Sequence, residues 1–406
     1  MARKYFYGYN IVAASFIIQG VTYGAMFTYG VFFKEFQAEF GWSRTLISGA
    51  SSLALFFGGA MGVLSGRLND RIGPIGLTVG TSIPMGIGLL LLSRLHSPWL
   101  LYLLWGGLVG IGLGSHDVIT LSTVARWFIR RRGMMSGIVK MGTGAGQLLV
   151  PLFAAVLITA YGWRSAYIIL GAVVLAILLV VAQVLRYEPQ GMGLLPDNAE
   201  KAVNTKGSGS GSRGVSLGSA ARTMQFWALC TAELASFFCL LTIVVHIVPH
   251  AMDLGLPPAI AAGVISAIGG MSMLGRIVMG TASDRIGGKR SLIICFIVLL
   301  CALLWLQVAG ETWMLFLFAA VYGFAHGGLF TVVAPTLAEL FGTGSHGVLF
   351  GIVLFSGNIG AAIGPILAGY VFDVTGSYRI IFLGLAGAAA LGIGLTALLK
   401  PVKIPG

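Results

Sequence analysis

The sequence predicts an all-α membrane protein with twelve transmembrane helices in two pseudo-symmetric six-helix bundles. The first observation is composition: 57% of the 406 residues are apolar and only 9% are charged, whereas a soluble domain carries roughly 25% charged residues. The second is a set of twelve apolar runs near the roughly 20 residues needed to cross a bilayer. The third is a pattern that recurs half a chain length later. We therefore expect the lipid bilayer to surround most of the protein.

The predicted spans divide evenly along the chain. Six precede residue 187 and six follow residue 222, so we predict an N-terminal bundle at 1–187, a linker at 188–222 and a C-terminal bundle at 223–406. The linker contains Gly207–Arg213, a glycine–serine stretch of the kind that forms flexible connections. The spans are approximately 9–33, 44–66, 75–94, 98–125, 134–159, 165–186, 225–249, 258–280, 291–309, 313–340, 347–371 and 379–399.

The distribution of basic residues predicts the orientation. With both termini inside, eighteen Lys and Arg residues lie on cytoplasmic segments and five lie outside, as the positive-inside rule requires. The first span follows Met1–Tyr5 without a small-residue cleavage site, so we interpret it as an uncleaved span and not a signal peptide. We expect a multi-pass protein of the cell (inner) membrane with cytoplasmic termini, in a monomeric state.

The composition also limits the partners and cofactors. The net charge of +12 is explained by this orientation, and no basic stretch is interleaved with stacking aromatics, so we expect no nucleic-acid partner. The four cysteines lie in apolar runs without metal-ligand spacing, and we interpret them as packing residues. No nucleophile–base pair or nucleotide-binding loop stands out. We therefore expect no enzyme activity, no metal and no cofactor.

Two similar octapeptides connect pairs of spans. Gly66–Gly73 and Gly280–Gly287 both follow the pattern G-x-(L/A)-x-D-R-I-G. Gly280 follows Gly66 by a separation that we call the half-chain offset. The same offset relates Arg132–Gly137 to His346–Gly351. Two homologous halves are a known plan for secondary transporters.

This pattern resembles the major facilitator superfamily over nearly the whole chain. Three stretches are more particularly similar to the monocarboxylate transporters and the related oxalate–formate exchangers: Arg126–Gly137, Met192–Asp197 and Arg222–Trp227. Arg276 stands where both groups carry an essential substrate-binding arginine. The resemblance implies a transporter whose helices line a central cavity.

Two positions depart from those families. Animal monocarboxylate transporters carry an aspartate one turn before the arginine, where this chain has Ser272. Oxalate exchangers carry a lysine in the eleventh span, and residues 347–371 contain none. The missing lysine argues against a doubly charged substrate.

Arg276 and Asp117 are the first candidates for substrate chemistry, because ionisable groups inside a membrane are costly. The guanidinium of Arg276 is planar and can bind a carboxylate through two hydrogen bonds. Its alternative role is a structural ion pair. Asp117 could neutralise Arg276 until a proton releases it, or it could be hydrogen-bonded within its own half. We predict that Asp117 and Glu233 are proton-coupling sites, with a buried structural acid as the alternative for Glu233.

Further candidates are weaker. His246 and His250 lie one turn apart and titrate near neutrality, so either could meet the anion or simply be interfacial. Lys140 is expected to extend its stem to the cytoplasmic interface, with contact to the substrate as the alternative. Asn358 could bond the substrate or another helix.

The last candidate residues lie in the first span and in the two octapeptides. Tyr23 and Phe27 share a face and are predicted pocket walls, although such stripes are more often packing. Gly66 and Gly280 would let helix ends approach, and Asp70 and Asp284 would bond helix N-termini or arginines. Arg126 is the expected partner of Asp70. The predicted gating residues are Gly66, Asp70, Arg71, Arg126, Gly280, Asp284 and Arg285.

The resemblance, together with these residues, implies a secondary carrier for a small monocarboxylate such as lactate or pyruvate, moved together with a proton. The anion would bind Arg276 near the middle of the membrane. An anion exchanger, or an exporter of larger organic solutes, is the alternative within the same fold. A transporter-like sensor without transport is a third possibility.

Overall fold

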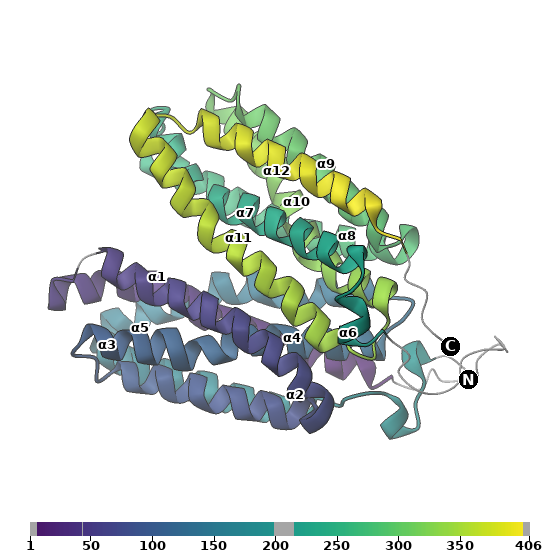
Figure 1. Ribbon diagram of the computed structural model, residues 1–406. Coiled ribbons are helices and arrows are strands. Elements are labelled where there is room, and N and C mark those ends of the chain that lie inside the picture. Colours follow the sequence, from purple (N-terminus) through teal and green to yellow (C-terminus); the bar gives the residue numbers. More distant parts are fainter. Residues whose placement is uncertain (1–5, 43, 199–214, 401–406) are drawn as a thin grey trace. The chain divides into compact units, whose positions relative to one another are not determined.

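The computed structural model describes residues 6–42, 44–198 and 215–400, and every regular element in that part of the chain is helical. The glycine–serine stretch Gly207–Arg213 lies outside the described residues, and so does the side chain of Asp70. The helices run in purple to blue from α1 to α5 and in teal to yellow from α7 to α12 (Figure 1).

The chain divides into two compact units. Unit 1 holds Met1–Arg131, Ile138–Gly214 and Thr343–Ile352, and unit 2 holds Arg132–Gly137, Val215–Gly342 and Val353–Gly406. Two short segments therefore belong to the unit formed mainly by the other half: the first residues of α5 in unit 2 and the start of α11 in unit 1.

Unit 1 is built from the long helices of the first half. They are α1 (Gly8–Phe40), α2 (Arg44–Leu92), α3 (Pro98–Leu101), a π-helical stretch at Tyr102–Val109, α4 (Gly110–Trp127) and α5 (Arg132–Ala182). Short helical turns follow at Gln190–Met192 and Pro196–Asn198. The helix α4 packs against both α1 and α2, so its buried faces are shared with two other helices of the unit.

Unit 2 contains the helices of the second half. They are α6 (Leu217–Ala220), α7 (Met224–Asp253), α8 (Pro258–Ile286), α9 (Gly288–Leu306), α10 (Thr312–Phe341), α11 (His346–Thr375) and α12 (Arg379–Leu398). The helix α10 packs against α8 and α9, while α12 packs against α7 and α9.

Glycines in the left-handed region mark where spans end. Gly73 breaks α2 with φ 81°, and Gly162 breaks α5 with φ 76°, a backbone conformation that other residues rarely adopt. The described residues contain eleven apolar helical segments long enough to cross a bilayer. One of these, Arg132–Ala182, has 51 residues and is divided at Gly162 into two spans. The predicted twelve spans are thereby accounted for.

The same glycine geometry recurs in both halves of the chain. Three pairs of left-handed glycines are separated by the half-chain offset, namely Gly41 and Gly255, Gly73 and Gly287, and Gly162 and Gly376. The repeat seen in the sequence is therefore also a repeat of backbone turns.

Helix contacts depend on the small size of glycine. A Cβ on Gly146 of α5 would overlap the carbonyl oxygen of Gly20 in α1, and a Cβ on Gly360 of α11 would overlap that of Leu234 in α7. Both members of the second contact follow those of the first by the half-chain offset. Close backbone approach of this kind drives helix association in lipid, where hydrophobicity does not favour one apolar surface over another.

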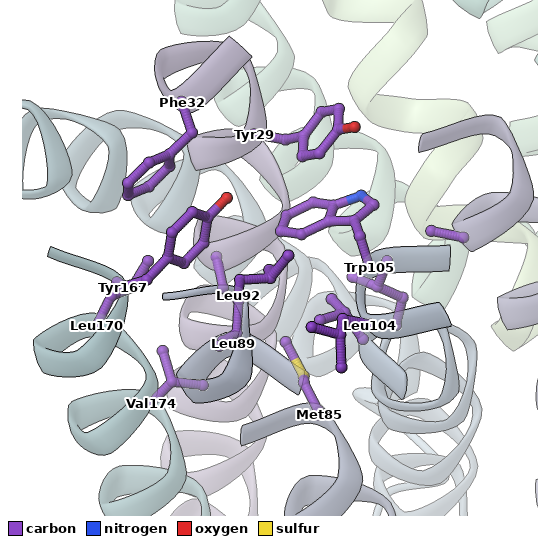
Figure 2. Packing of buried hydrophobic residues seen from close by; sticks show 14 of the residues in the cluster. Tyr29, Phe32, Met85, Leu89, Leu92, Leu104, Trp105, Tyr167, Leu170 and Val174 are labelled. Atoms are coloured by element: carbon purple, nitrogen blue, oxygen red, sulfur yellow. The ribbon is translucent and has the colours of Figure 1, made fainter. Parts of the chain in front are cut away.

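An aromatic cluster fills the core of unit 1 (Figure 2). The rings of Tyr29 and Trp105 stack with centroids 4.3 Å apart, and those of Phe32 and Tyr167 stack at 3.8 Å. The Tyr29 hydroxyl donates to the carbonyl oxygen of Ile47 at 2.6 Å. The cluster thus joins α1, α2, α5 and the π-helical stretch around buried rings.

A partly exposed ion pair joins α1 to α5 just after the break at Gly162. Arg164 donates through Nη1 to Oε2 of Glu39 at 2.6 Å, and its Nη2 lies 2.5 Å from Oε1. The indole of Trp163 donates to Oε2 at 2.6 Å. Hydrogen bonds from Arg164, and then from Trp163, hold the pKa of Glu39 below its ordinary value.

We predict that Glu39→Gln lowers the melting temperature of the purified protein in detergent at pH 7 by a few degrees at most. A lowered pKa contributes stability that is present above the ordinary carboxylate pKa of about 4.3 and is lost as the pH falls through the lowered value. The side chain of Glu39 is 37% exposed, so we expect the loss to stay within about 1 kcal/mol. The difference from wild type should shrink as the pH falls below the ordinary carboxylate pKa of about 4.3, whereas a difference that grows on acidification would contradict the ion pair. Glu35→Gln, which removes another carboxylate of α1, is the control.

Candidate functional site

A buried ion pair lies between α4 and α5 of unit 1. The Nζ atom of Lys140 donates to Oδ1 of Asp117 at 2.5 Å, and each residue is only 4% exposed. Gln19 of α1 donates through Nε2 to the same oxygen at 2.7 Å. Gln19 is held in turn by Thr143, which donates to its Oε1 at 3.0 Å, and by a bond to Thr120 at 2.8 Å. Three helices therefore share one polar network.

The position of Lys140 corrects the sequence-based expectation. An ammonium group at the cytoplasmic interface was predicted, but the side chain is buried and bound to Asp117. Removing an ion from water costs several kcal/mol, and only a close counter-charge with further hydrogen bonds offsets that cost. The Asp117 carboxylate supplies the counter-charge and a hydrogen bond, so the lysine points into the bundle.

The same contact bears on the predicted role of Asp117. The carboxylate was expected either to neutralise Arg276 or to be hydrogen-bonded within its own half. Its contacts in unit 1 are those of the second alternative, with Lys140 as the cation. Tyr23 lies beside the pair, with the Lys140 nitrogen 5.7 Å from its ring centroid, and Phe27 one turn further along α1 is 36% exposed.

His116 faces away from this network. Its Nδ1 shares a hydrogen bond with Thr22 at 2.7 Å, and its Nε2 lies 3.2 Å from the Ser82 hydroxyl. Successive residues of a helix are rotated by about 100°, so the two neighbours Asp117 and His116 serve different contacts. His116 joins α1, α2 and α4 through neutral hydrogen bonds.

Arg276 is buried in unit 2 at the contact between α8 and α10. It is 6% exposed, and Gly327 of α10 lies so close to α8 that an added Cβ would overlap the Ser272 carbonyl and meet the Arg276 amide nitrogen at 3.0 Å. Ser272, one turn earlier, shares a 2.9 Å hydrogen bond with Nδ1 of His326. The backbone that carries the guanidinium is therefore tightly fixed.

The other candidates in unit 2 line α7 and α11. Glu233 is 3% exposed, and a Cβ on Gly357 of α11 would meet its Cγ at 3.1 Å. Asn358, the next residue of α11, is half-buried. Glu233 follows Gln19 by the half-chain offset, so the acid occupies the repeat position of the amide that holds Asp117. Its role in proton coupling stays a prediction.

The two histidines of α7 contact other helices. Both ring nitrogens of His246 have protein partners, the Tyr378 hydroxyl at 3.1 Å and the Pro365 carbonyl at 3.0 Å. His250 packs edge-on against Tyr378 and Phe382. These contacts give His246 a structural role in unit 2, and substrate binding by either histidine stays a prediction.

One repeated octapeptide makes a defined contact at a helix N-terminus. The carboxylate of Asp284 accepts hydrogen bonds from the backbone N–H groups of Gly133 at 2.6 Å and Met134 at 2.8 Å. These are unsatisfied donors of the first turn of α5, where a negative charge also favours the helix dipole. A Cβ on Gly280 would meet the Gly133 carbonyl oxygen at 2.5 Å, so glycine is needed for the approach.

The first octapeptide makes a similar approach in unit 1. A Cβ on Gly66 would overlap the backbone of Gly347 at the start of α11. The predicted pairing of Arg126 with Asp70 involves a side chain outside the described residues. The guanidinium of Arg126 lies over the Tyr187 ring, 4.1 Å from its centroid. Arg71 and Arg285 are exposed.

Two features were missed in the sequence. The Lys140–Asp117 pair had a signal, because two opposite charges inside apolar spans must each be neutralised. The second is Asp197, whose Oδ2 accepts from the backbone N–H groups of Ile129 at 2.8 Å and Arg130 at 2.6 Å.

Within the described part of the chain, no three His, Cys, Asp or Glu side chains form a group able to hold a metal ion.

We predict that Gly327→Ala destabilises the protein by about 1 to 3 kcal/mol, the usual cost of overpacking. The new methyl group would collide with the Ser272 carbonyl and displace the backbone that carries Arg276. Thermal unfolding in detergent would measure the loss as a lower melting temperature. Gly269→Ala on α8, where an added Cβ meets no atom within 4 Å, should leave the melting temperature unchanged or raise it slightly. Equal effects of the two substitutions would show that the close approach is not the cause.

Sequence comparison identifies similar transporters. The family model described as Major Facilitator Superfamily matches residues 15–306 and 272–406. Monocarboxylate transporter 13 of Rattus norvegicus is 29% identical over 399 residues, covering 95% of this chain and 87% of that protein. Monocarboxylate transporter 11 of Homo sapiens is also 29% identical, covering 98% of this chain and 84% of the human protein.

Solved structures of similar fold are also transporters. A variant of the fucose:proton symporter of E. coli aligns with a TM-score of 0.74 at 15% identity, covering 97% of this chain and 99% of the symporter. A proton:xylose symporter bound to 6-bromo-6-deoxy-D-glucose aligns with a TM-score of 0.71 at 17% identity, covering 96% and 94% of the two chains. At these identities the likeness concerns the fold alone, and it confirms the predicted all-α transporter architecture.

Proposed function

Because the chain belongs to the major facilitator superfamily and is related to the monocarboxylate transporters, we propose that it carries a small monocarboxylate such as lactate or pyruvate across the membrane. The observation that carries this proposal is Arg276, a guanidinium only 6% exposed within the apolar helix α8. A permanently charged group in such a place needs an anionic partner at some stage of its work. A carboxylate is the anion that its planar fork fits best.

The proposed substrate is small and singly charged. One carboxylate satisfies the fork of Arg276. Tyr23 and Phe27, one turn apart on α1, stay predicted pocket walls. Moving the anion alone would carry negative charge through a medium of low dielectric constant. We therefore propose proton-coupled transport by alternating access, with Asp117 and Glu233 as the candidate proton sites. The protein would lie in the cell membrane with both termini in the cytoplasm.

An anion exchanger, or an exporter of larger organic solutes, is the alternative function. Uptake of a panel of radiolabelled short acids into proteoliposomes, with and without an imposed pH gradient, separates these possibilities. A monocarboxylate–proton carrier accumulates lactate or pyruvate when the lumen is alkaline. An exchanger takes up labelled acid only against unlabelled acid inside. A protein that moves no acid of the panel in either format contradicts the proposal.

We predict that Arg276→Lys loses most uptake of the transported monocarboxylate, at least tenfold in kcat/KM. The ammonium keeps the charge but cannot form the two parallel hydrogen bonds of the guanidinium. Arg290→Lys is the matched control, because Arg290 is an exposed arginine of the same unit. Equal amounts of reconstituted protein should be compared. Uptake by Arg276→Lys at the wild-type level would remove the residue from the binding role.

We further predict that Asp284→Asn slows turnover several-fold while substrate affinity changes little. An amide can replace only one of the two acceptor oxygens that bind Gly133 and Met134, and it removes the negative charge at the first turn of α5. The loops act on the conformational equilibrium and not on the substrate itself. Initial uptake rates and equilibrium binding, measured on the same preparation, separate the two effects.

Glu339→Gln is the control for Asp284→Asn. The Glu339 carboxylate also accepts from a backbone N–H, that of Gly288 at 2.7 Å, but this contact joins α9 and α10 and does not involve α5. Turnover should be nearly normal in Glu339→Gln. A large loss of affinity in Asp284→Asn with normal turnover would contradict the gating role.

A further inference from the structure

We infer that the substrate carboxylate also binds Lys140 of unit 1 at a step of the transport cycle, and that Asp117 takes up the coupled proton when the substrate claims the lysine. This inference rests on the proposed function. In the empty carrier the two residues neutralise each other in unit 1. The substrate would replace one carboxylate on the ammonium with another, so that binding and protonation become one exchange.

The geometry of the ion pair suits such an exchange. Oδ1 of Asp117 receives both Lys140 at 2.5 Å and Gln19 at 2.7 Å. Gln19 is itself oriented by bonds to Thr143 and Thr120, so Asp117 remains anchored when the lysine leaves. The ammonium stands on a flexible four-carbon stem and has three donors. It can turn to a new carboxylate while the amide keeps the old one in place.

The surroundings allow a carboxylate to approach the lysine. Tyr23 of α1 lies beside the ammonium, 5.7 Å away, and is only half-buried. Phe27, one turn on, is 36% exposed. An acid with a short apolar tail would meet aromatic surface at Tyr23 and Phe27 and the cation at Lys140.

Within unit 1 the charges of Asp117, Lys140 and the substrate carboxylate balance only if a proton enters. Aspartate and lysine together carry no net charge, and an arriving monocarboxylate adds one negative charge. Transfer of Lys140 to the substrate leaves the Asp117 carboxylate buried without its cation, a state that costs several kcal/mol. A proton from water forms an O–H bond on Asp117 and restores neutrality. Release of the substrate reverses both steps, which couples one proton to each monocarboxylate.

The groups around Asp117 leave few other acceptors for this proton. The helix α1 presents Gln19 and Tyr23, α5 presents Lys140 and Thr143, and α2 approaches through Ser65 and Ser82, which bind Ser115 and His116 of α4. The titratable side chains of this set are Tyr23, Lys140 and His116. His116 is bound to Thr22 and Ser82 on the other face of α4.

The test compares purified variants in proteoliposomes and in detergent. The substrate is whichever of lactate or pyruvate the wild type transports. Asp117→Asn should lose accumulation driven by a pH gradient, yet still exchange labelled for unlabelled acid. Addition of the acid to weakly buffered wild-type protein should remove about one proton per bound molecule from solution, and Asp117→Asn should remove none. If the pair is only a structural salt bridge, the wild type and Asp117→Asn should give the same proton count.

A double variant keeps the test decisive if Asp117→Asn fails to fold. Asp117→Asn/Lys140→Gln replaces both charges by neutral groups of similar size, so we expect it to fold. It should show at least a tenfold higher KM and no proton uptake. Thr123→Ala is the control on α4, because its hydroxyl bonds only to the Ile119 carbonyl one turn back, and it should behave as wild type.

The outcomes are distinguishable. If the wild type transports the acid and takes up protons, and either Asp117 variant does the same, the inference is overturned. The proposed function then stands. A normal KM in the double variant removes Lys140 from the binding site. A wild type that transports no monocarboxylate overturns the proposed function, and the inference with it.

Discussion

A charge inside hydrocarbon has no water to neutralise it, and the architecture of this transporter depends on that constraint. Each ionic group within a span must find its partner in the protein. The Lys140–Asp117 pair satisfies the rule directly, with Gln19 and two threonines completing the hydrogen bonds. The planar guanidinium of Arg276, buried in the apolar helix α8, is the proposed binding group for the substrate carboxylate.

The constraint also explains the reliance on glycine. Helices in lipid associate through close backbone contact and not through burial of apolar surface, and a Cβ at Gly146, Gly327 or Gly360 would collide with the neighbouring helix. Left-handed glycines perform a second task, since they turn the chain between spans at repeated positions. The two uses together account for much of the high glycine content, 60 residues of 406.

The fold was largely predictable from the sequence, and the site was predictable only in part. Long apolar runs and a repeat at half the chain length identify a twelve-span transporter because span length and loop position are one-dimensional properties. Contacts between helices are not. Lys140 and Asp117 lie close in the chain but on separate helices, and nothing in their spacing shows that the lysine turns inward. Gly133 and Asp284, from opposite halves of the chain, meet only once it is folded.

The neutrality of the Lys140–Asp117 pair has a consequence for the electrical behaviour of the carrier. Moving one elementary charge through a potential of 100 mV exchanges about 2.3 kcal/mol with the membrane field. A lone lysine in α5 would feel that force in every cycle and would make the empty carrier favour one orientation in an energised cell. Paired with Asp117, the ammonium contributes no net charge, so the field does almost no work on this part of unit 1. The resting voltage of the cell is thereby kept from acting on these two residues.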